Sequence, residues 1–275
     1  MLEFSVLASG SSGNSLYLQT ESTKILLDAG ISGKQIRTRL ETVGASPLDE
    51  IDAILLTHEH IDHVRGLSQV IKHSTAPVYA TEGTWSGSGT KVNPESFDIN
   101  RWHRVQDKDT LTIGDITVTT FAVSHDAEEP VAFRFDSNGE SLAVVTDLGY
   151  MSDTIKSVLT GCHTYILETN HDVDMLRAGR YPWSVKRRIL SDKGHLSNHD
   201  ATLALADLLG TDEVSVYLAH LSEENNQRDL AELTVESLLH EIKPHYKDQT
   251  RLHHTSRHEP TPLCRAVSPF VPRSQ

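Results

Sequence analysis

The sequence predicts a single α/β domain. Its 275 residues, of which 37% are hydrophobic, suffice for one large core, and no linker or composition shift divides the chain before about residue 250. Short apolar segments rich in β-branched residues alternate with segments of helical periodicity. The candidate functional residues other than His195 lie at or just after the end of a predicted strand, which places them on one consistent scaffold.

The strands and helices are predicted from hydrophobic periodicity and from the turn residues that bound each segment. Strands are expected at residues 4–7, 16–20, 24–27, 53–56, 77–80, 110–123, 131–135, 141–146, 164–168 and 214–219. Helices are expected at residues 35–43, 64–73, 153–160, 199–209 and 227–241. The pair Asn138-Gly139 suits a hairpin turn between two of these strands.

The ends of the chain differ from this pattern. From Arg251 onward the sequence is rich in His, Pro, Ser and Arg with little apolar periodicity. We therefore expect a domain over residues 1–250 and a disordered tail over 251–275. The N-terminal residues lack a basic and then apolar leader, and no apolar stretch approaches 18 residues, so we expect a cytoplasmic protein without a membrane partner. Cys162 and Cys264 lie far apart, consistent with a reducing compartment.

The most informative segment follows the apolar run 51–56 and reads Thr57-His58-Glu59-His60-Ile61-Asp62-His63-Val64. His58 and His60, two positions apart in an extended turn, can reach one cation, whereas Asp62 and His63 point to the other side and can hold a second. A solvated histidine cluster on a loop is the alternative, and it would not require the flanking pattern. The segment therefore predicts a site for two divalent metal ions.

This segment resembles the metal-binding motif of the metallo-β-lactamase superfamily, whose other motifs follow in order around Asp28, His125, Asp147 and His220. The resemblance implies a four-layer αββα metallo-β-lactamase-type sandwich and a hydroxide that bridges two metals. The implied ligands are His58, His60 and His125 for one metal, Asp62, His63 and His220 for the other, and Asp147 for both. Histidine and aspartate ligands without thiolate suit Zn²⁺, Mn²⁺ or Fe²⁺.

The implied substrate depends on residues beyond the ligands. Asp147 stands where true β-lactamases carry cysteine, serine or no bridging ligand, which favours phosphodiesters or thioesters over antibiotics. Segments 168–172, 194–198 and 220–226 resemble the ribonuclease Z branch, in which His195 matches an extra histidine before the last ligand. Segments 4–15, 124–130 and 175–183 resemble the YycJ/WalJ (VicX) family of low-GC Gram-positive bacteria, to which nuclease activity on DNA ends has been attributed.

The resemblance thus implies a hydrolase that cleaves phosphodiester bonds of DNA, with Asp62 and His195 as catalytic residues. It favours an exonuclease and leaves the direction open, 5′ to 3′ included. Two other functions also stay open. A thioesterase or lactonase of the glyoxalase II kind shares the same seven ligands, and a non-catalytic regulatory partner of a cell-wall two-component system would keep the metal site as a relic.

Three further features each have two interpretations. The basic residues Arg177, Arg180, Lys186, Arg187, Arg188 and Lys193 either contact nucleic acid or form a solvated helix face. The segment from Ser9 to Ser15 either offers backbone N–H groups to a phosphate or is a plain hairpin turn. His171 either orients a ligand or substrate, or belongs to a structural turn.

Overall fold

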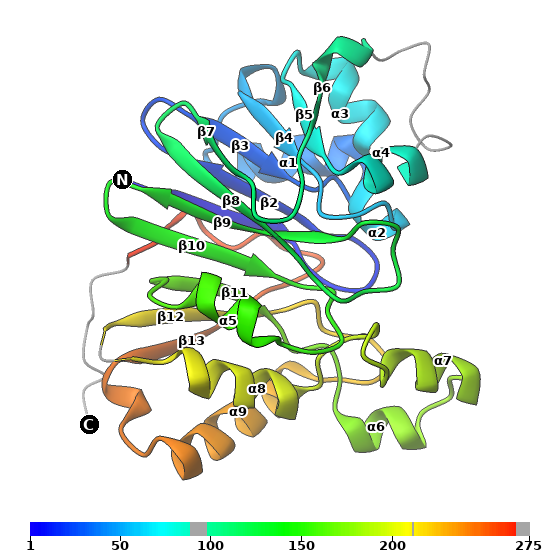
Figure 1. The fold of residues 1–275 in the computed structure, drawn as a ribbon, viewed down its shortest axis with the longest axis vertical. Helices are drawn as coiled ribbons and strands as arrows, with labels where there is room; N and C mark the ends of the chain where they lie inside the picture. Colours follow the sequence, from blue (N-terminus) through cyan, green and yellow to red (C-terminus); the bar gives the residue numbers. More distant parts are fainter. Residues whose placement is uncertain (89–97, 211, 268–275) are drawn as a thin grey trace.

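Two seven-stranded sheets pack face to face between outer layers of helices in the computed structural model, which describes residues 1–88, 98–210 and 212–267 (Figure 1). The first sheet, in spatial order, contains β14 (Cys264–Arg265), β1 (Glu3–Ala8), β2 (Ser15–Gln19), β3 (Lys24–Leu27), β4 (Ala53–Leu55), β5 (Val78–Ala80) and β6 (Trp102–Arg104). The second contains β13 (Thr250–His254), β12 (Val214–Ala219), β11 (Thr164–Glu168), β10 (Glu140–Val145), β9 (Val131–Ser137), β8 (Ile116–Ala122) and β7 (Thr110–Ile113). The predicted four-layer αββα class is confirmed.

Helices cover the outer face of each sheet. The described helices are α1 (Gly33–Val43), α2 (Ile61–Val64), α3 (Leu67–His73), α4 (Glu82–Ser88), α5 (Asp153–Leu159), α6 (Val173–Ala178), α7 (Trp183–Ile189), α8 (Asn198–Leu208) and α9 (Arg228–Ile242). Apolar residues of α1 and α3 pack on the first sheet, and those of α5, α8 and α9 pack on the second. Figure 1 shows α6 and α7 side by side at one end of the molecule, apart from the helices that cover the sheets.

Alternation along each strand divides the core into three apolar layers. In β3, Ile25 and Leu27 face the other sheet, whereas Leu26 faces the helices. In β12, Tyr217 points between the sheets, and Leu218 points towards the outer helices. Burial on both faces explains why these strands are continuous apolar runs rather than alternating patterns.

Some predicted elements differ from those observed. The predicted strand 110–123 is two strands, β7 and β8, because Gly114 turns the chain with a φ of 57°. The predicted helix 64–73 is divided at Gly66, where a Cβ atom would lie 2.1 Å from the backbone oxygen of Ile31. The hairpin at Asn138-Gly139 is confirmed, since Ser137 pairs with Glu140 across these two residues, which have φ angles of 51° and 79°.

The expected disordered tail is wrong for residues 251–267. Strand β13 pairs in parallel with β12, and β14 pairs with β1. Thr261 also joins β1, because its hydroxyl oxygen accepts a hydrogen bond from the Val6 amide at 2.9 Å. Residues 268–275 of the predicted tail lie outside the described residues. In the part of the chain that the structure describes, no helix is long and apolar enough to cross a membrane.

Candidate metal centre

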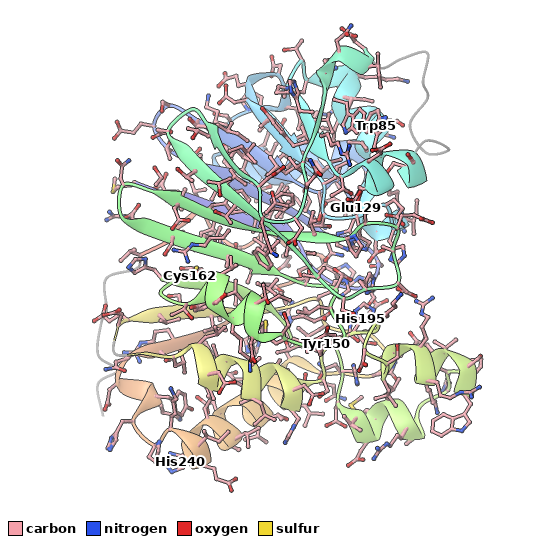
Figure 2. The ribbon with its side chains drawn as sticks, in the orientation of Figure 1. Trp85, Glu129, Tyr150, Cys162, His195 and His240 are labelled. Carbon is pink, nitrogen blue, oxygen red and sulfur yellow. The ribbon has the colours of Figure 1, made fainter. Side chains whose placement is uncertain are left out.

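The candidate ligands meet at one end of the sandwich because the strands that precede them end there. The motif at His58 follows β4, His125 follows β8, Asp147 follows β10 and His220 follows β12. His195 comes from the turn between α7 and α8 and lies at the end of the molecule that carries α7 (Figure 2). Strands from both sheets therefore deliver the site, and none of its predicted members lies elsewhere.

Three histidines form the first group. One ligand atom from each of His58, His60 and His125 lies within 4.8 Å of the others. His125 Nε2 is 3.3 Å from His60 Nδ1, so the two rings are in direct contact. The group is the set that the sequence assigned to one cation.

Asp62, His63 and His220 form the second group, again within 4.8 Å of one another. Asp62 Oδ2 lies 3.6 Å from the Nε2 atoms of both His63 and His220. Asp147 lies between the groups, with Oδ2 3.2 Å from His63 Nε2 and Oδ1 4.0 Å from His125 Nε2. A carboxylate in this position can contact a cation in each group.

Most of these rings are oriented by a hydrogen bond at the nitrogen that faces away from the centre. His63 Nδ1 lies 2.8 Å from Asp28 Oδ2, His125 Nδ1 lies 3.1 Å from the Gly194 carbonyl, and His220 Nδ1 lies 2.9 Å from Glu168 Oε1. Such bonds fix the tautomer and direct Nε2 towards a metal. Asp28, whose position matches the first of the superfamily's motifs, thus orients the candidate ligand His63.

The inward-facing atoms fit a divalent cation. His58 Nε2, His220 Nε2 and Asp147 Oδ2 are buried and have no hydrogen-bond partner among the described residues. Buried polar atoms are almost always satisfied, so a set that converges without such partners indicates a cation site. Imidazole and carboxylate donors suit Zn²⁺, Mn²⁺ or Fe²⁺. The fold and this cluster support divalent metal binding.

The charged groups of the centre strongly shift one another's pKa values. Burial disfavours the charged imidazole of His220, but Asp147 and the carboxylates of Asp62 and Glu168 outweigh it and raise its pKa to about 10. The pKa of His63 is also raised, against burial, by Asp147 and Asp28. Asp147 has its pKa held well below the ordinary value, because His220 and His63 overcome the effect of burial. Opposite charges thus compensate one another in a largely buried site.

The backbone is strained at three of these positions. Asp28, Asp147 and His220 have φ angles of 58°, 62° and 56°, in the left-handed region that non-glycine residues rarely adopt. Each lies at the end of a strand, where the turn directs the side chain into the centre. Backbone strain of this kind costs on the order of 1–3 kcal/mol per residue and clusters at functional sites.

Glu168, at the end of β11, was not among the predicted site residues. Its Oε1 lies 2.8 Å from His195 Nδ1 and 2.9 Å from His220 Nδ1, and its Oε2 accepts the Leu196 amide at 3.0 Å. Burial opposes ionisation, but His195 and His220 lower the pKa of Glu168 to about 2. One carboxylate therefore orients both a candidate ligand and the candidate catalytic histidine.

His195 also lies within reach of the candidate ligands. Its Nδ1 is 3.7 Å from Asp147 Oδ1. Burial opposes the charged ring, but the Glu168 carboxylate more than compensates and raises the pKa of His195. Since Nδ1 is engaged by Glu168, Nε2 is the nitrogen available to a substrate.

The segment Ser9–Ser15 packs against the histidine motif. Asn14 Nδ2 lies 3.1 Å from His63 Nε2, and the Asn14 amide donates to the Asp62 carbonyl at 2.8 Å. The Gly10 and Gly13 amides bond within the segment, to Asn14 Oδ1 and to the Gly10 carbonyl. Two of the N–H groups considered for phosphate binding are thus already satisfied, and the segment supports Asp62 and His63 instead.

The basic residues lie on the α6–α7 arm, which we define as residues 173–193. Lys186 is buried, and its ammonium donates to the Arg177 and Gly179 carbonyls, so it holds the arm together. Arg188 Nε lies 3.2 Å from Asp126 Oδ2, next to the centre. Arg177 is exposed and pairs with Asp174 at 4.0 Å, whereas Arg180, Arg187 and Lys193 are exposed at the surface.

His171 follows β11 and is almost fully buried. Its backbone forms a bridge with Ser197, and burial lowers the pKa of its ring to about 4. Neither ring nitrogen has a hydrogen-bond partner in the part of the chain that the structure describes. The ring is thus neutral near pH 7. Both predicted interpretations stay open, namely that His171 orients a ligand or substrate and that it belongs to a structural turn.

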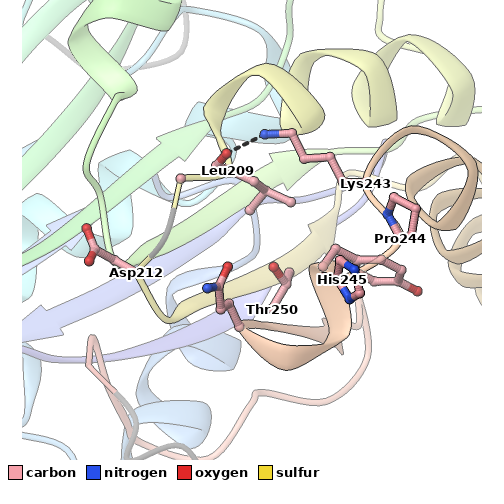
Figure 3. Close-up of a pocket in the computed structure, with 9 residues that line it drawn as sticks. Leu209, Asp212, Lys243, Pro244, His245 and Thr250 are labelled. Carbon is pink, nitrogen blue, oxygen red and sulfur yellow. Dashed lines mark hydrogen bonds between the residues drawn. The ribbon is translucent and has the colours of Figure 1, made fainter.

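A separate pocket lies at the opposite ends of β12 and β13. It is lined by residues that include Leu209, Lys243 and Thr250, and Lys243 Nζ donates to the Leu209 carbonyl (Figure 3). Val214 and Thr250, which begin the two strands, pair with each other, whereas His220 follows the far end of β12. This pocket therefore does not belong to the metal centre.

Comparisons with known proteins agree with the geometry. The model of the β-lactamase superfamily domain matches residues 23–220. The chain is 44% identical to exodeoxyribonuclease YycJ of Bacillus anthracis over 95% of its own length and 98% of that protein. The chain belongs to the YycJ/WalJ family of the metallo-β-lactamase superfamily.

Two further similar proteins also match almost the whole chain. It is 41% identical to exodeoxyribonuclease WalJ of Streptococcus pneumoniae, over 95% of this chain and 97% of that protein. The crystal structure of the metallo-β-lactamase fold protein YhfI from Bacillus subtilis superimposes with a TM-score of 0.71 at 14% identity, over 95% of this chain and 99% of that one. This likeness supports the fold alone.

Proposed function

We propose that this chain is a two-metal hydrolase that cleaves phosphodiester bonds in DNA. The observation that carries the proposal is that the candidate ligands converge in adjacent groups, in which the buried atoms His58 Nε2, His220 Nε2 and Asp147 Oδ2 lack a hydrogen-bond partner among the described residues. The names of the relatives from Bacillus anthracis and Streptococcus pneumoniae, which are exodeoxyribonucleases, support DNA as the substrate. An exonuclease is therefore the form of activity that we propose.

We assign the ligands to the two metals as the sequence predicts. His58, His60 and His125 would hold one divalent ion, Asp62, His63 and His220 would hold the second, and Asp147 would contact both. When bound, such ions lower the pKa of water to near 7 and neutralise charge on a phosphate, so a nucleophile is available without serine or cysteine. We propose Zn²⁺ or Mn²⁺ as the metals, with Fe²⁺ compatible with the same donors.

His195 has the geometry of a general acid. A nucleotide that leaves a phosphodiester needs a proton on its departing oxygen. Glu168 holds His195 at Nδ1 and raises the pKa of its ring, which favours the form that can donate a proton from Nε2. Asp62, the other proposed catalytic residue, lies across the centre and would act as a ligand.

A panel of substrates tests this proposal. Protein loaded with Zn²⁺ or Mn²⁺ is assayed on single-stranded, double-stranded and 5′-phosphorylated DNA and RNA, beside a thioester and a lactone. We expect hydrolysis of DNA to exceed that of every other substrate. Faster turnover of the thioester or lactone would favour the glyoxalase II alternative, and turnover of none would favour the regulatory one.

A further inference from the structure

The α6–α7 arm differs from the rest of the chain in charge. Residues 173–193 contain six basic and two acidic residues, a net charge of +4, whereas the whole chain has a formal net charge of −13. Arg180, Arg187 and Lys193 are exposed. A polyanion would therefore be attracted to this arm and repelled by most of the remaining surface.

An aromatic side chain lies among these cations. Trp183, the first residue of α7, is 61% exposed, although large apolar side chains are usually covered. Lys186 lies 5.6 Å from the centre of its ring and is itself held by two backbone carbonyls. The indole is thus supported from within the arm and still largely open to solvent.

The positions of these residues on α7 place them on one face. Trp183 and Arg187 are four residues apart, so they lie one above the other on the helix, and Leu190, 41% exposed, continues the same row. A row of one aromatic, one cationic and one apolar side chain matches a strand whose bases are free to stack and whose phosphates are exposed. A duplex buries its bases and offers only phosphates to such a row.

The arm leads directly to the metal centre. The His195 amide donates to the Ile189 carbonyl at the end of α7, at 3.0 Å. Gly194 allows this close turn, because a Cβ atom there would lie 2.0 Å from the same Ile189 oxygen. The carbonyl oxygen of Gly194 in turn lies 3.1 Å from His125 Nδ1. A strand held on α7 would therefore approach the centre from the side of His195.

We propose that the α6–α7 arm is the docking surface for single-stranded DNA, with Trp183 stacking on a base and Arg180, Arg187 and Lys193 contacting phosphates. This inference rests on the proposed DNA hydrolase function and specifies its substrate. The enzyme would engage an unpaired strand or a frayed end before the scissile bond reaches His195. Blunt duplex would bind through phosphates alone and would not contact the Trp183 ring.

Intrinsic fluorescence tests the contact directly, with metal-loaded protein and hydrolysis-resistant phosphorothioate oligothymidylate as the probe. We expect the single strand to quench the fluorescence of the unchanged protein and to leave that of Trp183→Phe almost unquenched. Trp183→Ala should weaken strand binding by about 5- to 150-fold, the usual effect of removing one stacked base. Leu233→Ala, at an equally exposed position on α9, is the matched control and should bind like the unchanged protein.

Two further probes separate stacking from charge. Heparin, a polyanion without bases, and blunt duplex DNA should both leave the Trp183 fluorescence nearly unchanged. Equal quenching by either probe, or unaltered strand binding by a folded, metal-containing Trp183→Ala, would overturn the proposal. Hydrolysis of bis(p-nitrophenyl) phosphate reports on the centre separately, so its absence in the unchanged protein would count against the proposed function and not against the docking surface.

Discussion

The metal centre and the α6–α7 arm are neighbours built on opposite physical principles. In the centre, His63, His220 and Asp147 are buried, and their opposite charges compensate one another. Hydrogen bonds hold the two imidazole rings in place. On the arm, Trp183 and Arg187 are exposed, and basic residues outnumber acidic ones. The centre is prepared to hold cations in fixed positions, whereas the arm is prepared to attract an anion and to adapt to it.

The basic residues of the arm make two kinds of contact. Arg188 pairs with Asp126 beside the centre, and Lys186 anchors the arm to its own backbone. The basic residues therefore fall into two classes that their sequence does not distinguish, one structural and one open to ligands. The comparison suggests that changes in the centre remove chemistry, whereas changes on the arm weaken binding and leave chemistry intact.

The largest effect is expected for Asp147→Asn. A neutral amide cannot offset the charge of two dications, so metal content should fall and hydrolysis should be abolished. Elemental analysis of the purified variant and a DNA cleavage assay check both results. A variant that keeps two metals and full activity would remove Asp147 from the site.

His195→Ala should reduce kcat by about 10²- to 10⁴-fold, the usual contribution of a positioned general acid, while both metals stay bound. The reduction should be smaller on a p-nitrophenyl phosphodiester, whose leaving group needs little protonation. Kinetics on both substrates and elemental analysis provide the measurement. Equal losses on the two substrates would exclude the general-acid role, and loss of metal would make His195 a ligand.

Glu168→Gln should lower metal affinity by about 10- to 100-fold, because the amide no longer orients His220 as the carboxylate does. The variant should also change acid unfolding. The pKa of Glu168 is lowered to about 2 in the folded protein, so its contribution to stability is present above about pH 4.5 and is lost as the pH falls towards 2. Acid titration of the metal-free proteins should show a smaller loss over this range for the variant, and identical curves would contradict the assignment.

The smallest effect is expected on the arm, for Arg187→Gln. Loss of one phosphate contact should weaken DNA binding uniformly and reduce the log–log salt slope by up to about one unit. Arg188→Gln is the matched comparison, because Arg188 pairs with Asp126 and should contribute less to the slope. Binding isotherms at several salt concentrations decide the point, and an unchanged slope for Arg187→Gln would make that residue part of a solvated face.

The sequence predicts the centre better than its surroundings. His58, His60, Asp62 and His63 lie within one short motif, so local spacing alone indicates a metal site. Glu168 and Asn14 approach the same centre from distant parts of the chain, and only the packing of the strands reveals that they do. No local pattern distinguishes them from other polar residues at strand ends.

The errors in the fold have a similar cause. Strand β13 is stabilised by pairing with β12, and β14 by pairing with β1, although the segment from Arg251 has little periodicity of its own. Lys186 looked like its basic neighbours, but the fold buries it. Contacts between separate elements decided each case, and the local sequence pattern could not.

Metal titration of the stripped protein tests the central claim most directly. Protein freed of metal with a chelator is titrated with Mn²⁺ or Zn²⁺, and hydrolysis of 5′-phosphorylated DNA is followed at each step. Two-metal catalysis predicts that activity is absent at the start and rises until about two ions per chain are bound. Undiminished hydrolysis by protein shown by elemental analysis to be metal-free would contradict it.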